Sequence, residues 1–324
     1  MKNLLYISLV LLSALGSCKN QEMEFPDFDT QSVYFAYQTP IRTITLGEDI
    51  FDTSLDNQHK IQIMGTLGGV YENKKEITIG ISVDNSMTQG LSFGPPLSGI
   101  VRAMPANYYT LASDKIVIPK GKIIGGVEVQ LTDAFFADPL SVNTTYVIPL
   151  TMTNVVNAGS ILPAKKSTMY AVKYINPWTG YYLRRGKDTF VGKGGNTSLN
   201  SMVVRHMQYV EKDEINKLNT LALNKAAFPV TFKGSGGVNI DRILVLTFDN
   251  SGNCTVAAGD GSFTATGTGK FVKRGEKNSW GNQDRDALYL NYQVDLNDRT
   301  VTSVDTLVMR DRGVKAETFL LGVN

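Results

Sequence analysis

The sequence predicts an all-β protein of two domains, and three observations carry this prediction. At 324 residues the chain is long for a single hydrophobic core. Apolar and polar residues alternate along many short segments, and turn-forming residues separate these segments. The 30 glycines and 14 tyrosines are typical of strands and turns, and no helix of ordinary length is evident.

The first seventeen residues have the features of a secretory signal peptide. Lys2 supplies a positive charge, and residues 4–15 form an apolar run too short to span a bilayer permanently. The run ends in Leu15-Gly16-Ser17-Cys18, which looks like a lipobox. We expect residues 1–17 to be removed and Cys18 to carry the lipid, because several acyl chains on one cysteine give stable anchoring. Cys254 would then have no disulfide partner within the chain.

Residues 18–30 are expected to form a lipidated tether. Acidic side chains follow closely behind the cysteine, at Glu22, Glu24, Asp27 and Asp29. Such a segment resembles the surface-export signal of Gram-negative gut anaerobes. It fits a solvated linker equally well, and both interpretations stay open.

The first domain is expected over residues 31–157. Along residues 77–83, isoleucine and valine alternate with small or polar residues, as in a strand with one buried face. Similar segments follow at residues 115–118, 127–131 and 146–153. Gly94-Pro95-Pro96 is one of the turn sequences that separate these segments. Short strands at regular spacing predict a β-sandwich.

The second domain is expected over residues 166–324. Glycine, serine, proline and lysine interrupt the alternation at residues 157–166, which marks the boundary. Strands are expected beyond it at residues 170–175, 242–248, 254–257, 287–294 and 304–310. Roughly eight to ten strands in about 150 residues fit an up-and-down barrel or a second sandwich.

Several motifs resemble one group of proteins. The motifs are Asn107-Tyr108-Tyr109-Thr110-Leu111, Ile118-Pro119-Lys120-Gly121, Tyr146-Val147-Ile148-Pro149-Leu150, Asn176-Pro177-Trp178-Thr179-Gly180-Tyr181-Tyr182 and Asp305-Thr306-Leu307-Val308-Met309-Arg310-Asp311-Arg312-Gly313. They are similar to motifs in two-domain surface lipoproteins of gut anaerobes. In that group an Ig-like N-terminal sandwich of unknown function precedes an antiparallel calycin- or lipocalin-like β-barrel.

The resemblance covers nearly the whole mature chain and carries functional expectations. It implies a lipid-anchored outer-membrane protein that faces the cell exterior and takes part in polysaccharide utilisation. It also implies an association with outer-membrane transporters of the starch-utilisation type. The group has no agreed binding residues, so the resemblance implies none for this chain.

Composition argues against several other classes of protein. The 32 basic and 30 acidic residues nearly cancel and form no basic block, so we expect no nucleic-acid partner. His59 and His206 lie far apart, and the sequence has no CxxC motif, so we expect no metal and no cofactor. No serine-nucleophile motif or local signature of a catalytic carboxylate pair is present. The chain is therefore not expected to be an enzyme.

The candidate ligand-binding residues are aromatic residues with polar neighbours. Trp280 lies in a polar loop with Asn282, Asp284 and Arg285, and such groups stack on sugar rings and bind their hydroxyls. A second set is Trp178 with Tyr181 and Tyr182, just after a proline turn. The alternative for this second set is that it closes one end of the barrel as core.

The leading functional prediction is non-catalytic carbohydrate binding at the cell surface, with an oligo- or polysaccharide as partner. In this hypothesis the first domain is a spacer and the second presents the site. The alternative is an adhesin or an accessory interaction subunit of an outer-membrane transporter complex. A third hypothesis, storage of a small apolar ligand inside the barrel, requires an open interior.

Overall fold

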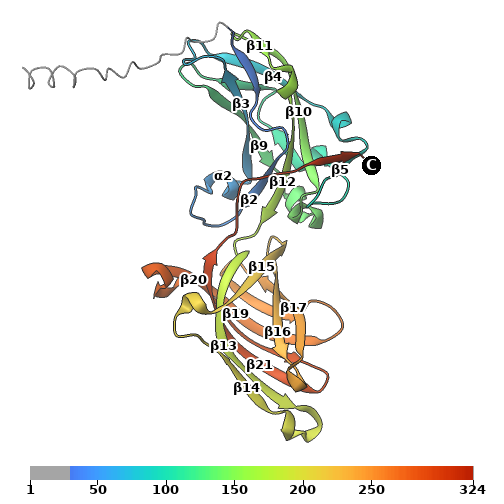
Figure 1. Cartoon of the computed structure of the whole chain (residues 1–324), viewed down its shortest axis with the longest axis vertical. Helices are drawn as coiled ribbons and strands as arrows, with labels where there is room; N and C mark the ends of the chain where they lie inside the picture. Colours follow the sequence, from blue (N-terminus) through green and yellow to red (C-terminus); the bar gives the residue numbers. More distant parts are fainter. Residues whose placement is uncertain (1–29, 324) are drawn as a thin grey trace, which may run out of the picture.

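The structure is a computed structural model that describes residues 30–323. The predicted signal peptide, Cys18 and nearly all of the tether lie outside the described residues. Two β-domains follow one another along the long axis of the molecule (Figure 1). Among the described helices, none is long and apolar enough to cross a membrane.

The first domain is one strongly curled sheet. The main strand order is β11-β1-β3-β9-β8-β4-β10-β12-β2-β22, with β6 beside β10 and β7 beside β9. The strands are β1 (Ser32–Phe35), β2 (Pro40–Thr45), β3 (Lys60–Gly68), β4 (Ile77–Val83), β6 (Arg102–Ala103), β7 (Tyr109–Leu111), β8 (Lys115–Ile118), β9 (Ile124–Leu131), β10 (Tyr146–Val156), β11 (Ser160–Ile161), β12 (Ser167–Ile175) and β22 (Glu317–Thr318). A separate pair joins β5 (Leu91–Phe93) to β23 (Leu321–Val323). The short helices α2 (Ser54–Asn57) and α3 (Asp133–Ala137) lie in connections.

Alternation along these strands builds one sandwich core. In β4 the side chains of Ile77, Ile79 and Ile81 are buried, as the sequence pattern predicts. A Cβ on Gly65 in β3 would lie 3.4 Å from Ile79 and from Ile116. Because β3 and β4 are not neighbours in the sheet, this contact shows that the sheet folds over to face itself.

The second domain is a closed antiparallel barrel. Its strands are β13 (Gly180–Gly192), β14 (Ser201–Arg205), β15 (Glu214–Ala222), β16 (Lys225–Lys233), β17 (Asn239–Phe248), β18 (Asn253–Ala258), β19 (Thr264–Ser279), β20 (Gln283–Asp295) and β21 (Arg299–Asp311). Pairing of β13 with β21 closes the barrel, and β14 and β15 pair with successive parts of β13. The predicted fold class, a sandwich followed by an antiparallel barrel, is confirmed.

The barrel interior is a packed core. Every strand from β15 to β21, together with β13, contributes buried apolar side chains. A buried ionic network lies among them: Arg184 binds Asp305 (Nη2–Oδ2 2.9 Å) and donates to the hydroxyl of Tyr292. Arg205 bridges the carboxylates of Asp305 and Asp188. Storage of an apolar ligand requires an open interior, whereas this interior is filled by side chains.

The domain boundaries differ from those expected from the sequence. The prediction assigned residues 166–324 to the barrel. In the structure β12 lies between β10 and β2 in the first domain, and β22 and β23 return to that domain. The barrel strands therefore begin at Gly180 and end at Asp311. Alternation reveals a strand but not the sheet that it joins, because pairing partners lie far away in sequence.

The C-terminal segment completes the first domain. It leaves the barrel, runs along β2 and ends beside β5, as the red ribbon shows (Figure 1). Phe319 is 3% exposed and packs edge-to-face against Phe93, with ring centroids 5.1 Å apart. Its neighbours include Ile41, Val147 and Met169.

Arg312 joins the two domains where they meet. The Arg312 guanidinium is nearly buried and donates to the backbone carbonyls of Leu46 and Glu48 in the first domain. It also donates to the carbonyls of Asn176 and Thr179 at the entry to the barrel. Burial lowers the pKa of Arg312, because these partners are neutral carbonyls and the surroundings are largely dry.

Candidate functional site

A pocket of about 440 Å³ lies between the two domains, and we call it the junction pocket. Residues 47–51 between β2 and α2 form its first-domain wall. The β19–β20 hairpin and the end of β21 form its barrel wall. The volume lies within the range typical of small-ligand sites.

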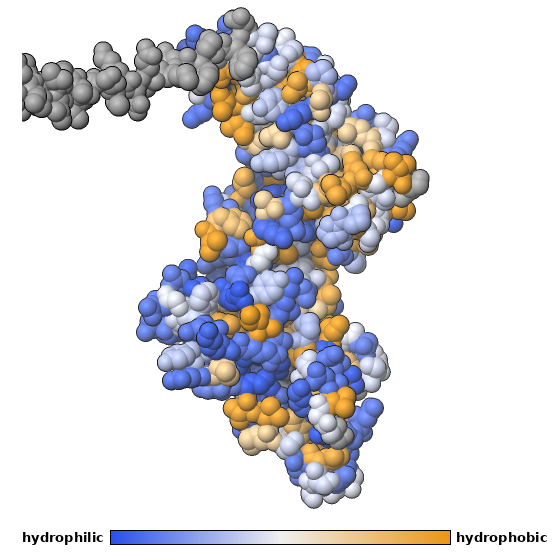
Figure 2. Space-filling model, viewed as in Figure 1, coloured by the Kyte–Doolittle hydropathy of each residue, from blue (hydrophilic) through white to orange (hydrophobic). Residues whose placement is uncertain are grey.

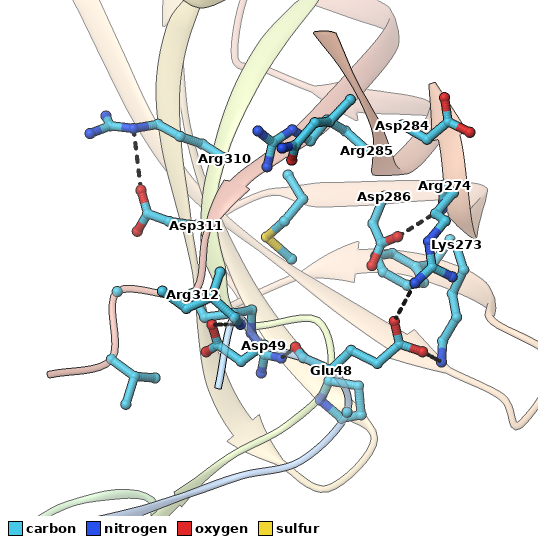
Figure 3. Close-up of a pocket in the computed structure, with 18 of the residues that line it drawn as sticks. Glu48, Asp49, Lys273, Arg274, Asp284, Arg285, Asp286, Arg310, Asp311 and Arg312 are labelled. Carbon is cyan, nitrogen blue, oxygen red and sulfur yellow. Dashed lines mark hydrogen bonds and ion pairs between the residues drawn. The ribbon is translucent and has the colours of Figure 1, made fainter. Parts of the chain in front are cut away.

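Charged side chains of both signs surround the junction pocket (Figure 3). The acids are Glu48, Asp49, Asp284, Asp286 and Asp311, and the bases are Lys273, Arg274, Arg285, Arg310 and Arg312. Apolar side chains from Phe51, Pro177, Phe271 and Met309 lie between them. The arrangement combines planar hydrogen-bonding groups with apolar surface.

Several of these charges are paired across the domains. Glu48 binds Lys273 (Oε1–Nζ 2.7 Å) and Arg274 (Oε2–Nη2 3.2 Å). The hydrogen bond from Lys273 holds the pKa of Glu48 below its ordinary value. On the rim, Arg310 pairs with Asp311 at 3.2 Å. These pairs are exposed and contribute little stability each, but they orient the walls of the pocket.

One acceptor in the pocket is unused. The Oδ1 atom of Asp49 accepts from the backbone N–H of Ile50 at 2.6 Å. Its Oδ2 atom is shielded from solvent and accepts no hydrogen bond within residues 30–323. A buried carboxylate oxygen without a donor is costly, and because this atom is shielded from solvent it is not open to a ligand in this conformation.

The predicted residues Trp280 and Arg285 form a unit at the barrel wall. The Arg285 guanidinium carbon lies 3.8 Å from the centroid of the indole, and its Nε donates to the Trp280 carbonyl at 3.2 Å. The indole N–H in turn donates to the carbonyl of Met309 at 3.4 Å. Trp280 is thus anchored beside the pocket and orients Arg285, which lines it.

The other two residues predicted in this loop occupy different positions. Asp284 lines the pocket, but its carboxylate pairs with Lys277 (2.9 Å) and accepts from the N–H of Asn278. Asn282 is exposed at the hairpin tip, where its φ of 55° lies in the left-handed region that asparagine tolerates.

The second predicted set does not form one site. Trp178 and Tyr182 close the end of the barrel that faces the first domain, whereas Tyr181 lies outside the barrel. Trp178 stacks on Phe248 with centroids 4.0 Å apart and planes 5° apart. Tyr182 is fully buried and donates its hydroxyl to the Trp178 carbonyl at 2.7 Å. Tyr181 faces outward, with the Lys217 ammonium 5.3 Å from its ring centre, and lines a separate depression.

The sequence predicted no ligand-binding residue on the first-domain wall of the pocket. Glu48 and Asp49 lie more than 220 residues from the hairpin that they face. A local indication was present, because Ile50 and Phe51 are consecutive large apolar residues in a polar turn and both are exposed. Among residues 30–323, no three His, Cys, Asp or Glu side chains gather as metal ligands.

Comparisons with known proteins identify both halves of the chain. Residues 177–313 match the family of a domain of unknown function, DUF5627, and residues 28–159 match a family described as an N-terminal domain. A protein of unknown function from Bacteroides ovatus, solved at 2.40 Å, is 42% identical. The alignment covers 92% of this chain and 100% of that chain, with a TM-score of 0.86.

Two more distant structures were also found, and no curated protein matches the chain. An auxiliary nutrient binding protein from Bacteroides thetaiotaomicron is 11% identical over 83% of this chain and 90% of that one, with a TM-score of 0.40. A second Bacteroides ovatus protein of unknown function is 13% identical over 90% and 99%, with a TM-score of 0.42. Through its 42% identity to the first Bacteroides ovatus protein, the chain belongs to the family of two-domain proteins that join this N-terminal domain to a DUF5627 barrel.

Proposed function

We propose that this protein binds an oligo- or polysaccharide in the junction pocket without catalysing a reaction. In this proposal Cys18 carries the lipid, and the protein is displayed on the outer face of the outer membrane. The observation that carries the proposal is that Asp49 and Arg285, the arginine that Trp280 orients, line opposite walls of one pocket (Figure 3).

The chemistry of the pocket suits a saccharide. Sugar hydroxyls both donate and accept, so adjacent hydroxyls can bind a carboxylate on one wall and a guanidinium on the other. The C–H faces of a sugar ring pack against apolar surface, which Phe51 and Phe271 provide. An open site of this kind is expected to give dissociation constants of about 10 µM to 1 mM, or roughly −4 to −7 kcal/mol.

The titration of two pocket carboxylates argues against their use as general acids. Glycoside hydrolysis uses a general acid whose pKa is raised, so that it still holds a proton near neutral pH. Hydrogen bonds from lysines lower the pKa of both Glu48 and Asp284 instead. Both groups therefore remain carboxylates, which accept hydrogen bonds but have no proton to give.

Calorimetric titration of the soluble chain, residues 19–324, tests the proposal. The probes are soluble starch, xylan, β-mannan, arabinogalactan, inulin and chondroitin sulfate. Arg285→Ala and Asp49→Asn are each expected to weaken binding about ten-fold or more, since a hydrogen bond to a charged group contributes about 1.5–3 kcal/mol. Arg102→Ala, an exposed arginine on the first domain, is the matched control. Equal affinities for wild type and both pocket variants would refute the site.

A second candidate function is an interaction subunit, and one surface favours it. Val191, Met202, Val204 and Val304 lie on the adjacent strands β14, β13 and β21 and are 50–64% exposed. Apolar patches are visible toward the end of the barrel that lies away from the first domain (Figure 2). Exposed apolar side chains gathered on neighbouring strands are typical of protein interfaces. Co-purification of an outer-membrane transporter with wild type, but not with Met202→Ser/Val204→Ser, would support this role.

A further inference from the structure

A second depression of about 510 Å³ lies on the first domain, and we call it the tyrosine groove. Tyr37, Arg42, Phe51 and Tyr170 line one side of it. The C-terminal segment, residues 314–318, lines the other side where β22 pairs with the start of β2. None of the residues predicted from the sequence to bind ligand is among these.

Exposed aromatic surface distinguishes this groove. Tyr37 is 66% exposed and Phe51 is 39% exposed. Tyr170 is half-buried, and its burial raises the pKa of its hydroxyl, so the group stays a neutral donor and acceptor. Aromatic rings with polar tips, left open beside a groove, are the surface on which sugar rings stack.

Arg42 gives the groove a fixed donor. Its guanidinium binds the carbonyl of Thr43 and the carboxylate of Asp56, which is 1% exposed. Asp56 also accepts from the N–H of Thr45 at 2.8 Å, so the whole unit is tied to β2. Because Asp56 neutralises it, Arg42 offers directed hydrogen bonds without a free charge. A neutral polar ligand fits this chemistry better than an anion does.

The tyrosine groove adjoins the junction pocket. Phe51 and Val314 line both depressions. A ligand that fills the junction pocket and extends past these two side chains therefore enters the tyrosine groove. Chain molecules of repeating units, such as linear glycans, can occupy both, whereas a compact small molecule occupies only one.

We propose that the tyrosine groove is a second saccharide subsite, which binds further units of a linear glycan already held in the junction pocket. This inference rests on the proposed function. It assigns the first domain a direct part in binding, with Tyr37 as stacking platform and Arg42 as hydroxyl donor. Occupation of both depressions makes affinity depend on the length of the glycan, because the second contact forms at high effective concentration.

The test is calorimetry with fragments of two to eight sugar units, prepared from whichever of the six polysaccharides above wild type binds. Tyr37→Ala is expected to weaken binding of fragments of six or more units about ten-fold and to leave fragments of two or three units unchanged. Arg285→Ala is expected to weaken all lengths. Tyr209→Ala, a 57% exposed tyrosine outside both depressions, is the matched control. Thermal unfolding checks that each variant is folded.

The outcomes separate the two proposals. If Arg285→Ala weakens binding and Tyr37→Ala weakens it at no length, the subsite is overturned and the proposed function stands. If Tyr37→Ala weakens binding at every length and Arg285→Ala at none, the groove is a saccharide site and the junction pocket is not. If wild type binds none of the six polysaccharides, both proposals fall.

Discussion

Replacing Phe319 by alanine should detach the C-terminal strand from the first domain while the barrel remains folded. Phe319 is the large buried side chain of this segment, at 3% exposure, and it packs against Phe93. Phe→Ala substitutions in protein cores cost about 3–5 kcal/mol. The remaining attachments of this segment are few: the hydrogen bonds from Phe319 N–H to Thr39 and from Gly94 N–H to Leu320, the Lys173–Glu317 ion pair, and the short pairings of β22 and β23.

Hydrogen exchange at Gly94 measures this detachment directly. The Gly94 amide donates to the Leu320 carbonyl at 2.8 Å, so it exchanges only when the segment leaves. A loss of about 3–5 kcal/mol corresponds to an exchange rate about a hundred- to a few-thousand-fold faster, since each 1.4 kcal/mol is a factor of about ten. Leu320→Ala is the matched control, because Leu320 is 67% exposed on the same segment.

Two results would refute this reasoning. Exchange at Gly94 that stays within about five-fold of wild type in Phe319→Ala would show that the buried ring does not hold the segment. Equal acceleration in Leu320→Ala would show that truncating any side chain of this segment has the same effect, so the buried aromatic contact has no special part in the attachment. A barrel amide such as that of Val301 should exchange at the same rate in all three proteins.

Three further predictions concern the barrel and the junction. Asp305→Asn should lower the free energy of unfolding by about 3–5 kcal/mol in urea titrations, because Arg184 and Arg205 lose a buried partner; a loss below about 1 kcal/mol would contradict it. Burial raises the pKa of Cys254 to about 12. The thiol ionises near pH 9 in the unfolded chain and stays protonated in the folded one. The free energy of unfolding should therefore fall as pH rises from 9 to 11, and it should fall more steeply in wild type than in Cys254→Ala. Arg312→Lys should lower the free energy of unfolding by about 1–3 kcal/mol and widen the distribution of interdomain distances in X-ray scattering. The reason is that a lysine ammonium cannot bind carbonyls of both domains at once, as the planar guanidinium does. An unchanged distribution would contradict this prediction.

The strands were predictable where the pattern is local. Residues 77–83 and 115–118 coincide with β4 and β8, because one face of each is buried and isoleucine recurs at every second position. The partners of β12, β22 and β23 were not predictable. Their assignment to the first domain depends on contacts such as Phe319 with Phe93, more than two hundred residues apart.

The candidate site was predictable in part for the same reason. Arg285 stands out in the sequence because Trp280 lies five residues away in the same polar loop. Ligand contact by Trp280 stays a prediction; in the structure the Arg285 guanidinium lies over its ring and its N–H is bound to a carbonyl. Asp49 and Tyr37 carry no distinguishing pattern around them, and both line depressions that form only where distant segments meet.

By itself, the sequence determined the all-β class, the two domains and several strands of each, because these follow from alternation and turn chemistry within a few residues. It also contains the predicted export signal and Cys18. Only the tertiary structure decided where the C-terminus packs, that the barrel interior is filled, and which side chains face one another at the junction. Those features arise from the free energy of burying surfaces contributed by distant segments, and local sequence does not encode which distant surface each segment meets.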